Sequence, residues 1–339
     1  MSFTPVDLDR ELTRVGTRGH RAVVAGLVRA GERVCCGWSA SGEEPDESAL
    51  FEIGSITKAF TGVLLAEMVL RGEVALADPL SRHLPGLRPA WRYREPTLLE
   101  LATHRSGLPN TPGEMNRGEF AYALGVTRQD PWAAVTAADY RRLLSREAPR
   151  RAPGGRVGYS SMAVGLLGDA LAAVAGMSYE QLLTERVLAP LGMSATAVTV
   201  PPERRDRLMG GHSRRGRPRP PIQDFMPAAG SLRSSADDMV RLLAACLEPP
   251  DDALGAALRL AQQPQARIGK GLQVGLCWFI VTRRDRPRVV WHNGGTWGFR
   301  SFAGFAPDQG TGAVVMSNTS RSVDRLGLRL VQTTATPVG

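Results

Sequence analysis

Ser55 and Lys58 are the two residues whose types and spacing point most directly to chemistry. They stand three positions apart in the stretch FEIGSITKAF. Residues i and i+3 lie on one face of a helix, so the lysine amine can reach the serine hydroxyl. A helix N-terminus adds free N–H groups and a partial positive charge, which favour an anionic intermediate and lower the pKa of an amine. The pair therefore predicts a serine nucleophile whose proton passes to lysine.

Lysine is rare in this chain, and its rarity strengthens that interpretation. Of 42 basic residues, only Lys58 and Lys270 are lysines and the other 40 are arginines. Arginine keeps its proton at any working pH, whereas a lysine amine can be tuned to lose it. The spacing alone also fits an ordinary helix start with a solvated lysine. The scarcity of lysine favours the catalytic alternative.

Tyr159 is a candidate partner for this pair. It lies in GGRVGYSSMAVGLLG, after a glycine-rich turn and before an expected helix. A hydroxyl at that point can face a cleft, and a tyrosine near a lysine can share its proton and act as a base or an acid. A tyrosine in the core or at a rim is the alternative.

A glycine-rich strand near the C-terminus is the second candidate partner. In RVVWHNGGTWGF a strand runs into His292, Asn293, Gly294 and Gly295. Glycine at a strand edge permits close approach of the backbone to a ligand. We expect the N–H groups of Gly295 and Ser55 to form an oxyanion hole, in which one donor is typically worth about 3–4 kcal/mol in the transition state.

In this order and spacing, the motifs resemble those of serine hydrolases related to class C β-lactamases. That family includes D-alanyl-D-alanine carboxypeptidases, family VIII-type esterases and transacylases. The resemblance covers residues 10 to 320 and includes the phrases LATHRSGLP, PGGRVGYSS, VLAPLGM, AAGSLRSSADDM and HNGGTWGF. It implies that Ser55 is the acylated nucleophile, Lys58 its proton partner and Tyr159 a general base or acid. It also implies that the strand bearing His292 and Gly294 lines the substrate slot.

Two departures from the family pattern affect the expected substrate. Ser161 stands where the family usually has asparagine, and serine cannot present the paired donor and acceptor of a carboxamide. His292, Asn293 and Gly294 replace the Lys-Thr-Gly of the lactamases. Histidine is mostly neutral at pH 7, so a substrate carboxylate loses a permanent cation, although some carboxypeptidases carry histidine there. Arg300 is a candidate for the missing charge.

The elements expected to position these residues fall into three blocks. A helix over 6–18 precedes two strands within 22–40 that turn at Ala30-Gly31-Glu32, and a helix starting near Ser55 ends at Gly72. Short helices separated by Gly and Pro fill the middle. Helices near 235–248 and 252–263, strands within 272–318 and a closing helix near 323–332 follow.

The expected fold is α+β and β-lactamase/transpeptidase-like, an antiparallel sheet flanked by helices with an inserted all-helical domain. Residues 1–77 and 225–339 would form the α/β domain and 78–224 the helical domain, with the site in the cleft between them. Trp297 follows the glycine strand, where it either walls an acyl pocket or packs in the core.

Charge and composition limit the other classes of function. The net charge is +9, but the arginines are spread along the chain without a nucleic-acid-binding module, so we expect no nucleic-acid partner. The dense run Arg204–Arg219 is a solvated loop or, alternatively, an electrostatic guide for an anionic substrate. No apolar run is long enough for a membrane span and no secretory signal is visible, so we expect no membrane partner and a cytoplasmic location. Four cysteines and five scattered histidines show no metal pattern, and we expect no metal or cofactor.

The expected activity is acyl transfer through a serine ester, from a small-molecule acyl donor to a small-molecule acceptor or water. An esterase or transacylase in a biosynthetic pathway is favoured, because the chain shows no export signal and Ser161 removes an amide-reading group. A β-lactamase or D-alanyl-D-alanine carboxypeptidase is the alternative. A non-catalytic ligand-binding protein on the same fold is the alternative from another class. Gly-x-Ser-x-Gly is absent, which excludes an α/β-hydrolase. The sequence leaves the donor, the acceptor and the oligomeric state open.

Overall fold

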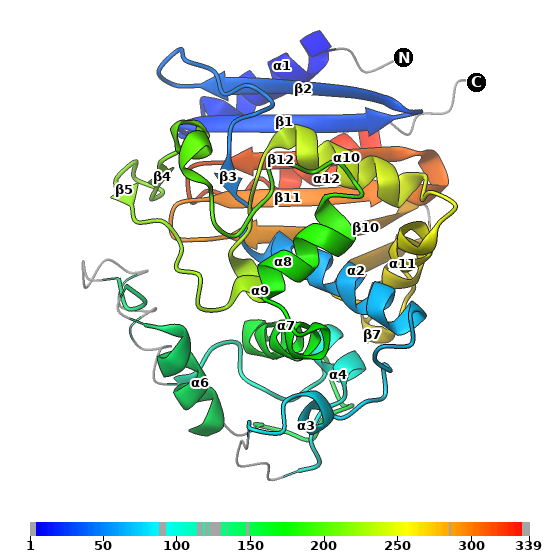
Figure 1. Cartoon of the computed structure of the whole chain (residues 1–339). Helices are drawn as coiled ribbons and strands as arrows, with labels where there is room; N and C mark the ends of the chain where they lie inside the picture. The colour runs from blue at the N-terminus through cyan, green and yellow to red at the C-terminus, as the bar shows by residue number, and fades with distance from the viewer. Residues whose placement is uncertain are drawn as a thin grey trace.

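An antiparallel sheet of eight strands forms the central layer of the molecule (Figure 1). The computed structural model describes residues 5–87, 93–113, 118, 122, 130–133, 135–146, 149–284 and 286–333. The strand order is β2-β1-β12-β11-β10-β9-β8-β7, so strands from the two ends of the chain meet in one sheet. The strands are β1 Ala22–Arg29, β2 Glu32–Ser39, β7 Ala266–Gly269, β8 Leu272–Val274, β9 Phe279–Arg283, β10 Arg286–Gly295, β11 Arg300–Ala306 and β12 Thr311–Ser317.

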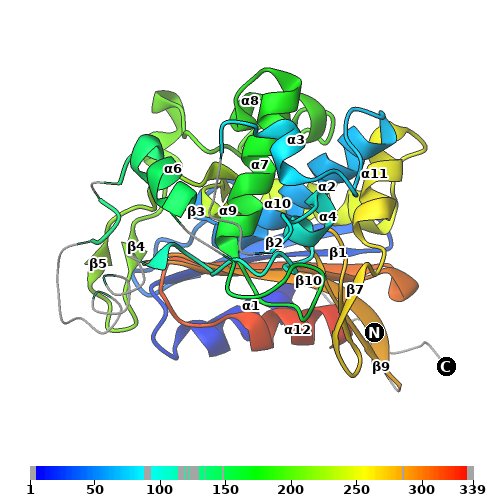
Figure 2. The same ribbon diagram turned by 90° about the horizontal axis from the view of Figure 1, so that it is seen from below.

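Helices cover both faces of this sheet because alternate residues of its central strands are buried on opposite sides. Val23 and Ala25 of β1 belong to the hydrophobic cluster that holds α1 Pro5–Gly16 and α12 Asp324–Thr333. Val24 belongs to the larger cluster on the other face. Figure 2 shows α1 and α12 together on one side of the sheet. The larger cluster includes α2 Thr57–Leu70, α10 Ala236–Leu247 and α11 Ala253–Ala261.

The middle of the chain folds mainly into short helices packed beyond α2. Most of its buried apolar residues belong to the same hydrophobic cluster as α2 and the sheet, and the division at residues 78 and 224 stays a prediction. In the described ranges, no single helix has the length and apolar character to cross a membrane. The helices Ser161–Ala175 and Tyr179–Leu188 reach that length and apolar character only together, and they are bent by 81° relative to each other. The elements are α3 Leu80–His83, α4 Leu98–Ala102, α6 Ala137–Arg146, α7 Ser161–Ala175, α8 Tyr179–Leu183, a π-helical turn Thr184–Leu188, a 3-10 turn Pro202–Arg207, β4 Gly211–His212 and β5 Pro218–Arg219.

Local sequence signals explain most of these boundaries. The hairpin turn is confirmed at Ala30 and Gly31, which both have positive φ. Ser160 caps α7 and Ser235 caps α10, each accepting a hydrogen bond from an N–H in the first turn. Helix α4, in the stretch LLELATHRSGL, is only five residues long and ends before His104, which adopts a φ of +56°. Strand β7 was missed, since it has only four residues, with no run of β-branched or aromatic side chains, and lies at the edge of the sheet.

The nucleophile region contains a departure from the expected continuous helix. Residues Gly54–Ile56 form a 3-10 turn, followed by α2. Short segments complete its surroundings: β3 Phe51–Glu52 before it, and α9 Pro227–Gly230 and β6 Arg233–Ser234 from later in the chain. β3 pairs with β6, and α9 packs on α2. The first twelve residues of α2 are all buried, so this helix is fixed by its neighbours from every side.

Gly62 is the position of α2 at which this packing is tightest. A Cβ there would lie 2.0 Å from the Leu276 carbonyl oxygen. We therefore expect Gly62→Ala to lower the free energy of unfolding by about 1–3 kcal/mol, because the backbone must shift, despite the higher helix propensity of alanine. Urea unfolding would measure this change. Gly86→Ala is the matched control, since a Cβ at Gly86 meets nothing within 4 Å, and an equal loss in both variants would contradict the prediction.

Candidate active site

Lys58 and Ser55 lie in direct contact at the start of α2. The Lys58 Nζ donates a hydrogen bond to the Ser55 Oγ over 2.9 Å and another to the Ala229 carbonyl oxygen. The Lys58 side chain is fully buried. In the described part of the chain no carboxylate oxygen lies within 4 Å of its amine, so its nearest polar contacts are the serine and α9. The amine is thus held within proton-transfer distance of one hydroxyl.

Tyr159 lies over this pair, immediately before the Ser160 cap of α7. The centre of its ring is 5.1 Å from the Lys58 Nζ, and 38% of the residue is exposed. The ring packs on the ring of His104, with their centres 4.5 Å apart. Tyr159 therefore lies at the mouth of the site and is not a core residue, so its hydroxyl is available to a ligand.

Glycines bring the end of β10 against the turn that carries Ser55. Gly54 has a φ of +52°, and a Cβ on it would lie 2.7 Å from the Gly295 nitrogen. A Cβ on Gly294 would lie 1.9 Å from the Ile53 carbonyl oxygen. Only glycine allows such an approach of two backbones. It places the backbone of Ser55 beside that of Gly295, as a two-donor oxyanion hole requires.

A cavity of about 680 Å³ opens above these groups. Two of the ten residues expected in the site, Lys58 and His292, do not line it and are fully buried. Lys58 lies under Ser55 and reaches the cavity through it. The other expected residues all line this cavity: Ser55, Tyr159, Ser161, Asn293, Gly294, Gly295, Trp297 and Arg300.

His292 lies behind the cavity wall, whereas Gly294 of the same strand lines the cavity as expected. The His292 Nδ1 donates to the Asn293 carbonyl oxygen over 2.6 Å, and its Nε2 is buried with no hydrogen-bond partner in the described part of the structure. Burial, reinforced by the charge of Lys58, lowers the pKa of His292 to about 3. The ring is therefore neutral near pH 7 and brings no cation to a substrate.

His104 is a buried neighbour of the site to which sequence reasoning gave no role. Its ring lies against Tyr159 and 6.1 Å from the ring of Phe279. Its Nδ1 accepts a hydrogen bond from the Ser160 N–H over 3.3 Å. Burial, with a smaller contribution from Lys58, lowers the pKa of His104 to about 3. The sequence feature that could have indicated His104 is its place in the family-like phrase LATHRSGLP. Its contacts show that it supports the ring of Tyr159.

Asn110 is a second residue that sequence reasoning missed. It lines the cavity, and its Oδ1 accepts a hydrogen bond from the Ser161 N–H over 3.0 Å. Because that N–H needs an acceptor, the oxygen of the carboxamide faces Ser161 and the NH₂ group remains for a ligand. The cavity thus contains the Asn110 carboxamide next to Ser161, the position at which the family usually has asparagine.

Opposite charges meet on the side of the cavity that carries Gly295. The Arg300 Nη1 donates to the carbonyl oxygens of Thr296 and Phe299, both over 2.7 Å, and its guanidinium packs over Gly295. Burial lowers the pKa of Arg300 from its usual value. The Asn293 Nδ2 donates to Asp324 over 3.1 Å, and Asp324 also lines the cavity. This side can therefore contact a ligand with either a guanidinium or a carboxylate.

Aromatic side chains close one wall of the cavity. Trp297 packs edge-on against Tyr122, with ring centres 4.6 Å apart, and lies 6.1 Å from Trp132. Trp132 in turn packs on Phe225. Trp297, Trp132 and Phe225 all line the cavity, so this wall is apolar and suits a hydrocarbon group.

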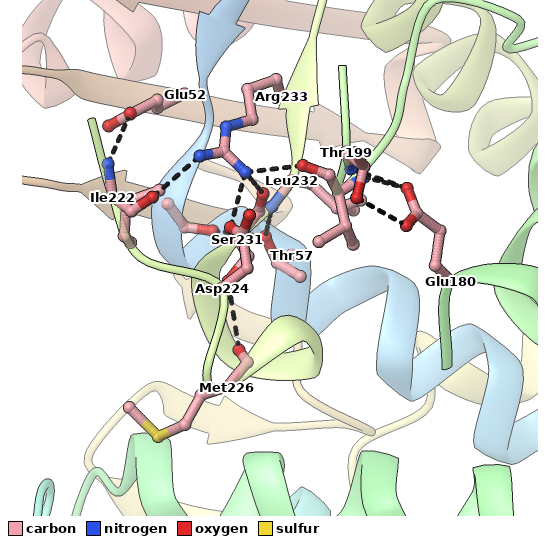
Figure 3. Close-up of polar contacts among 12 residues, drawn as sticks. Glu52, Thr57, Glu180, Thr199, Ile222, Asp224, Met226, Ser231, Leu232 and Arg233 are labelled. Carbon is pink, nitrogen blue, oxygen red and sulfur yellow. Dashed lines mark hydrogen bonds and ion pairs between the residues drawn. The ribbon is translucent and has the colours of Figure 1, made fainter. Parts of the chain in front are cut away.

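Figure 3 shows how a second wall, the segment 222–226, is fixed. The Arg233 guanidinium donates to the Ile222 carbonyl oxygen over 2.8 Å and to Asp224 over 2.6 Å. Glu52, buried beside the nucleophile turn, accepts from the Ile222 N–H over 2.8 Å. Burial raises the pKa of Glu52. These two side chains hold the cavity wall in place and were not singled out from the sequence.

Comparison with known proteins adds a family context to this geometry. A family model described as Beta-lactamase matches residues 8–334. The chain is 31% identical over 295 residues to the D-alanyl-D-alanine-carboxypeptidase/endopeptidase AmpH of Escherichia coli (strain K12), covering 81% of this chain and 72% of that protein. It is 29% identical over 306 residues to a beta-lactamase of the same strain, covering 80% and 76%. A crystal structure of a beta-lactamase/D-alanine carboxypeptidase from Pseudomonas syringae matches with a TM-score of 0.84 at 20% identity, over 97% of this chain and 98% of that chain, which confirms the predicted fold.

The buried histidines predict a dependence of stability on pH. The pKa of His104 is lowered in the folded state, so the unfolded chain takes up a proton first and stability is lost as the pH falls from about 6.5 toward 3. Between pH 6 and pH 5 we expect this histidine alone to cost about 1 kcal/mol. His104→Asn, which tolerates the positive φ, should remove that part of the slope in urea unfolding. Identical slopes for both proteins would contradict the prediction.

Proposed function

This chain belongs to the beta-lactamase family of serine hydrolases, and from that premise we propose that it is an esterase or transacylase that forms an acyl-enzyme on Ser55. The observation that carries the proposal is the 2.9 Å contact between the Lys58 Nζ and the Ser55 Oγ beneath the cavity. A serine hydroxyl is a weak nucleophile until a base takes its proton, and Lys58 is the base within reach.

The proposed reaction follows from the positions of these groups. The Ser55 Oγ attacks the carbonyl carbon of the donor while its proton passes to Lys58. The negative charge that develops on the carbonyl oxygen is stabilised by the N–H groups of Ser55 and Gly295. Tyr159 gives a proton to the leaving group as its bond to the carbonyl carbon breaks. Water, an alcohol or an amine then attacks the serine ester, and the proton transfers run in reverse to release the acyl product.

The chemistry of the cavity supports an ester of a small molecule as the donor. Ser161 supplies no carboxamide at the position where the family reads an amide, and His292 is neutral and buried. The wall around Trp297 is apolar. An uncharged acyl group can pack on this apolar wall. The predicted cytoplasmic location and small-molecule acceptor complete the proposal.

A β-lactamase or D-alanyl-D-alanine carboxypeptidase is the second candidate, and specific observations favour it. The relatives reported above carry those names. The Asn110 carboxamide offers an amide-reading group, and Arg300 offers a cation for a carboxylate. A non-catalytic binding protein has less support, because Ser55, Lys58 and Tyr159 are all present and close together.

Substitution of the two central residues tests the acyl-enzyme. We expect Ser55→Ala to abolish covalent labelling by a fluorophosphonate, measured as a mass increase of the intact protein, because the acylated oxygen is gone. We expect Lys58→Arg to lower turnover of p-nitrophenyl butyrate by at least about 1000-fold although the charge is kept, because arginine cannot accept the serine proton.

Lys270→Arg is the matched control for the lysine substitution, since Lys270 is exposed and does not line the cavity. It should leave turnover unchanged. Labelling that persists in Ser55→Ala, or full activity in Lys58→Arg, would show that the acyl-enzyme is formed elsewhere or that no amine base is used.

The choice of substrate separates the two candidate functions. We expect kcat/KM for p-nitrophenyl butyrate to exceed that for nitrocefin, because the position of Ser161 lacks the amide-reading group. Any residual turnover of nitrocefin should fall in Asn110→Ala, while ester turnover should change little, because only the lactam bears a side-chain amide. Fast nitrocefin hydrolysis with poor ester turnover would reverse the order of the two functions.

A further inference from the structure

A second cavity, of about 630 Å³, lies where the end of α1 meets the start of α12. These two helices lie together on the face of the sheet that is opposite to α2 (Figures 1 and 2). Arginines from three separate segments line it: one follows α1, one belongs to the arginine-rich run between β4 and β5, one shortly precedes α12 and two belong to α12. They are Arg18, Arg214, Arg321, Arg325 and Arg329.

The positive charge of this cavity is largely uncompensated. Arg329 pairs with Glu11 over 2.7 Å. The other four arginines have no carboxylate oxygen within 4 Å among the residues that the structure describes. Like charges gathered around one hollow repel each other, and this repulsion is relieved when an anion binds between them. The arrangement therefore favours occupation by a ligand with more than one negative charge.

The polar groups around the cavity are donors that fit such a ligand. Arg321 is held by a hydrogen bond from its Nη2 to the Arg214 carbonyl oxygen over 3.0 Å. Its Nε is buried with no partner in the described structure, so a donor is left unused. The Ser322 Oγ accepts from the Asp324 N–H over 3.2 Å, which leaves the hydroxyl proton for a ligand. His20 is buried in the wall, and its Nδ1 hydrogen bonds with the Ser317 hydroxyl.

The arginine cavity adjoins the active-site cavity. Ser322 lines both of them. Asp324, two residues after Ser322, lines the active-site cavity and accepts a hydrogen bond from Asn293. Its carboxylate therefore does not neutralise the arginines directly. The charge of Arg214 acts on Arg300 of the active-site cavity. The positive region thus continues from the side of Gly295 into the second cavity.

We propose that the arginine cavity binds the phosphate-bearing leaving group of an acyl donor whose carbonyl carbon is attacked by Ser55. This inference rests on the proposed acyl transfer. Planar guanidinium groups match phosphate oxygens in pairs, and several of them around one hollow suit a diphosphate or several phosphates. The loop containing Arg214 then acts as the electrostatic guide that the sequence left as an alternative to a solvated loop.

A phosphate-bearing thioester is the donor class that this geometry serves. The Ser55 Oγ forms a bond to the thioester carbonyl carbon, the C–S bond breaks, and the sulfur leaves with a proton from Tyr159. The phosphates remain in the arginine cavity until the thiol dissociates. No oxidant, reductant or further reactant is needed, and the serine ester then passes its acyl group to the acceptor.

Two thioesters, one with and one without the phosphate-bearing nucleotide, test the proposal. The probes are butyryl-coenzyme A and S-butyryl-pantetheine, which carry the same acyl group on the same thiol arm. In the wild-type protein we expect a lower KM for the coenzyme A thioester. In the double variant Arg321→Ala/Arg325→Ala that KM should rise about tenfold or more, because two charge-assisted contacts are lost. The kinetics of the pantetheine thioester and of p-nitrophenyl butyrate should not change.

The double variant Arg33→Ala/Arg267→Ala is the matched control for net charge. Both residues are exposed, on strands β2 and β7, and neither lines the arginine cavity. It should behave as wild type with every substrate. A general effect of lower positive charge would instead raise the KM of butyryl-coenzyme A equally in the two double variants and would overturn the proposal.

Direct binding gives a second measurement that does not depend on turnover. Isothermal titration with pyrophosphate should show one site in the wild-type protein and in Ser55→Ala, and none in Arg321→Ala/Arg325→Ala. Three results would overturn this proposal alone. Pyrophosphate does not bind, the two thioesters have equal kcat/KM, or neither thioester is turned over by a protein that hydrolyses p-nitrophenyl butyrate. Failure to hydrolyse p-nitrophenyl butyrate would contradict the proposed acyl-enzyme function instead.

Discussion

The site depends on two stretches of backbone that approach so closely that neither can carry a side chain at the contact. Gly54 lies against Gly295, and Gly294 lies against the Ile53 carbonyl oxygen. The sheet fixes one stretch, since β10 is paired on both sides, and the buried helix α2 fixes the other. A serine placed on the turn between them meets backbone donors of a strand that is more than two hundred residues away in the sequence. The oxyanion hole of the proposed reaction is formed at this contact.

Charge in the site is arranged by burial as much as by residue type. Two histidines lie near the nucleophile, and burial keeps both neutral at pH 7. Lys58 is the amine that touches Ser55, and Arg300 packs over Gly295. One wall of the cavity is thus apolar, while Arg300, Asp324 and the arginine cavity lie on the side of Gly295. This separation suits a donor with an uncharged acyl group and a charged leaving group.

The use of arginine and lysine follows a division of roles. Arg233 fixes the cavity wall through the carbonyl oxygen of Ile222 and the carboxylate of Asp224. Arg186 joins Glu67 of α2 to Glu73 beyond it, over 3.1 Å and 2.9 Å. A guanidinium can hold several acceptors at once and does not give up its proton, which makes it a structural connector. The one lysine in the site contacts the hydroxyl that must lose a proton.

The sequence by itself determined the local groups: the serine and lysine one helical turn apart, the tyrosine before α7, the glycines at the end of a strand, and the elements that carry them. These follow from spacing, capping and turn chemistry, which are properties of short segments. The burial that moves His292 behind the wall, the supporting roles of His104 and Asn110, and the fixing of residues 222–226 by Glu52 and Arg233 were decided by the tertiary structure. Each depends on contacts between residues far apart in the chain, and no local pattern encodes which distant side chain fills a given space. The arginine cavity belongs to the same class, because its five arginines come from segments separated by almost the whole length of the protein.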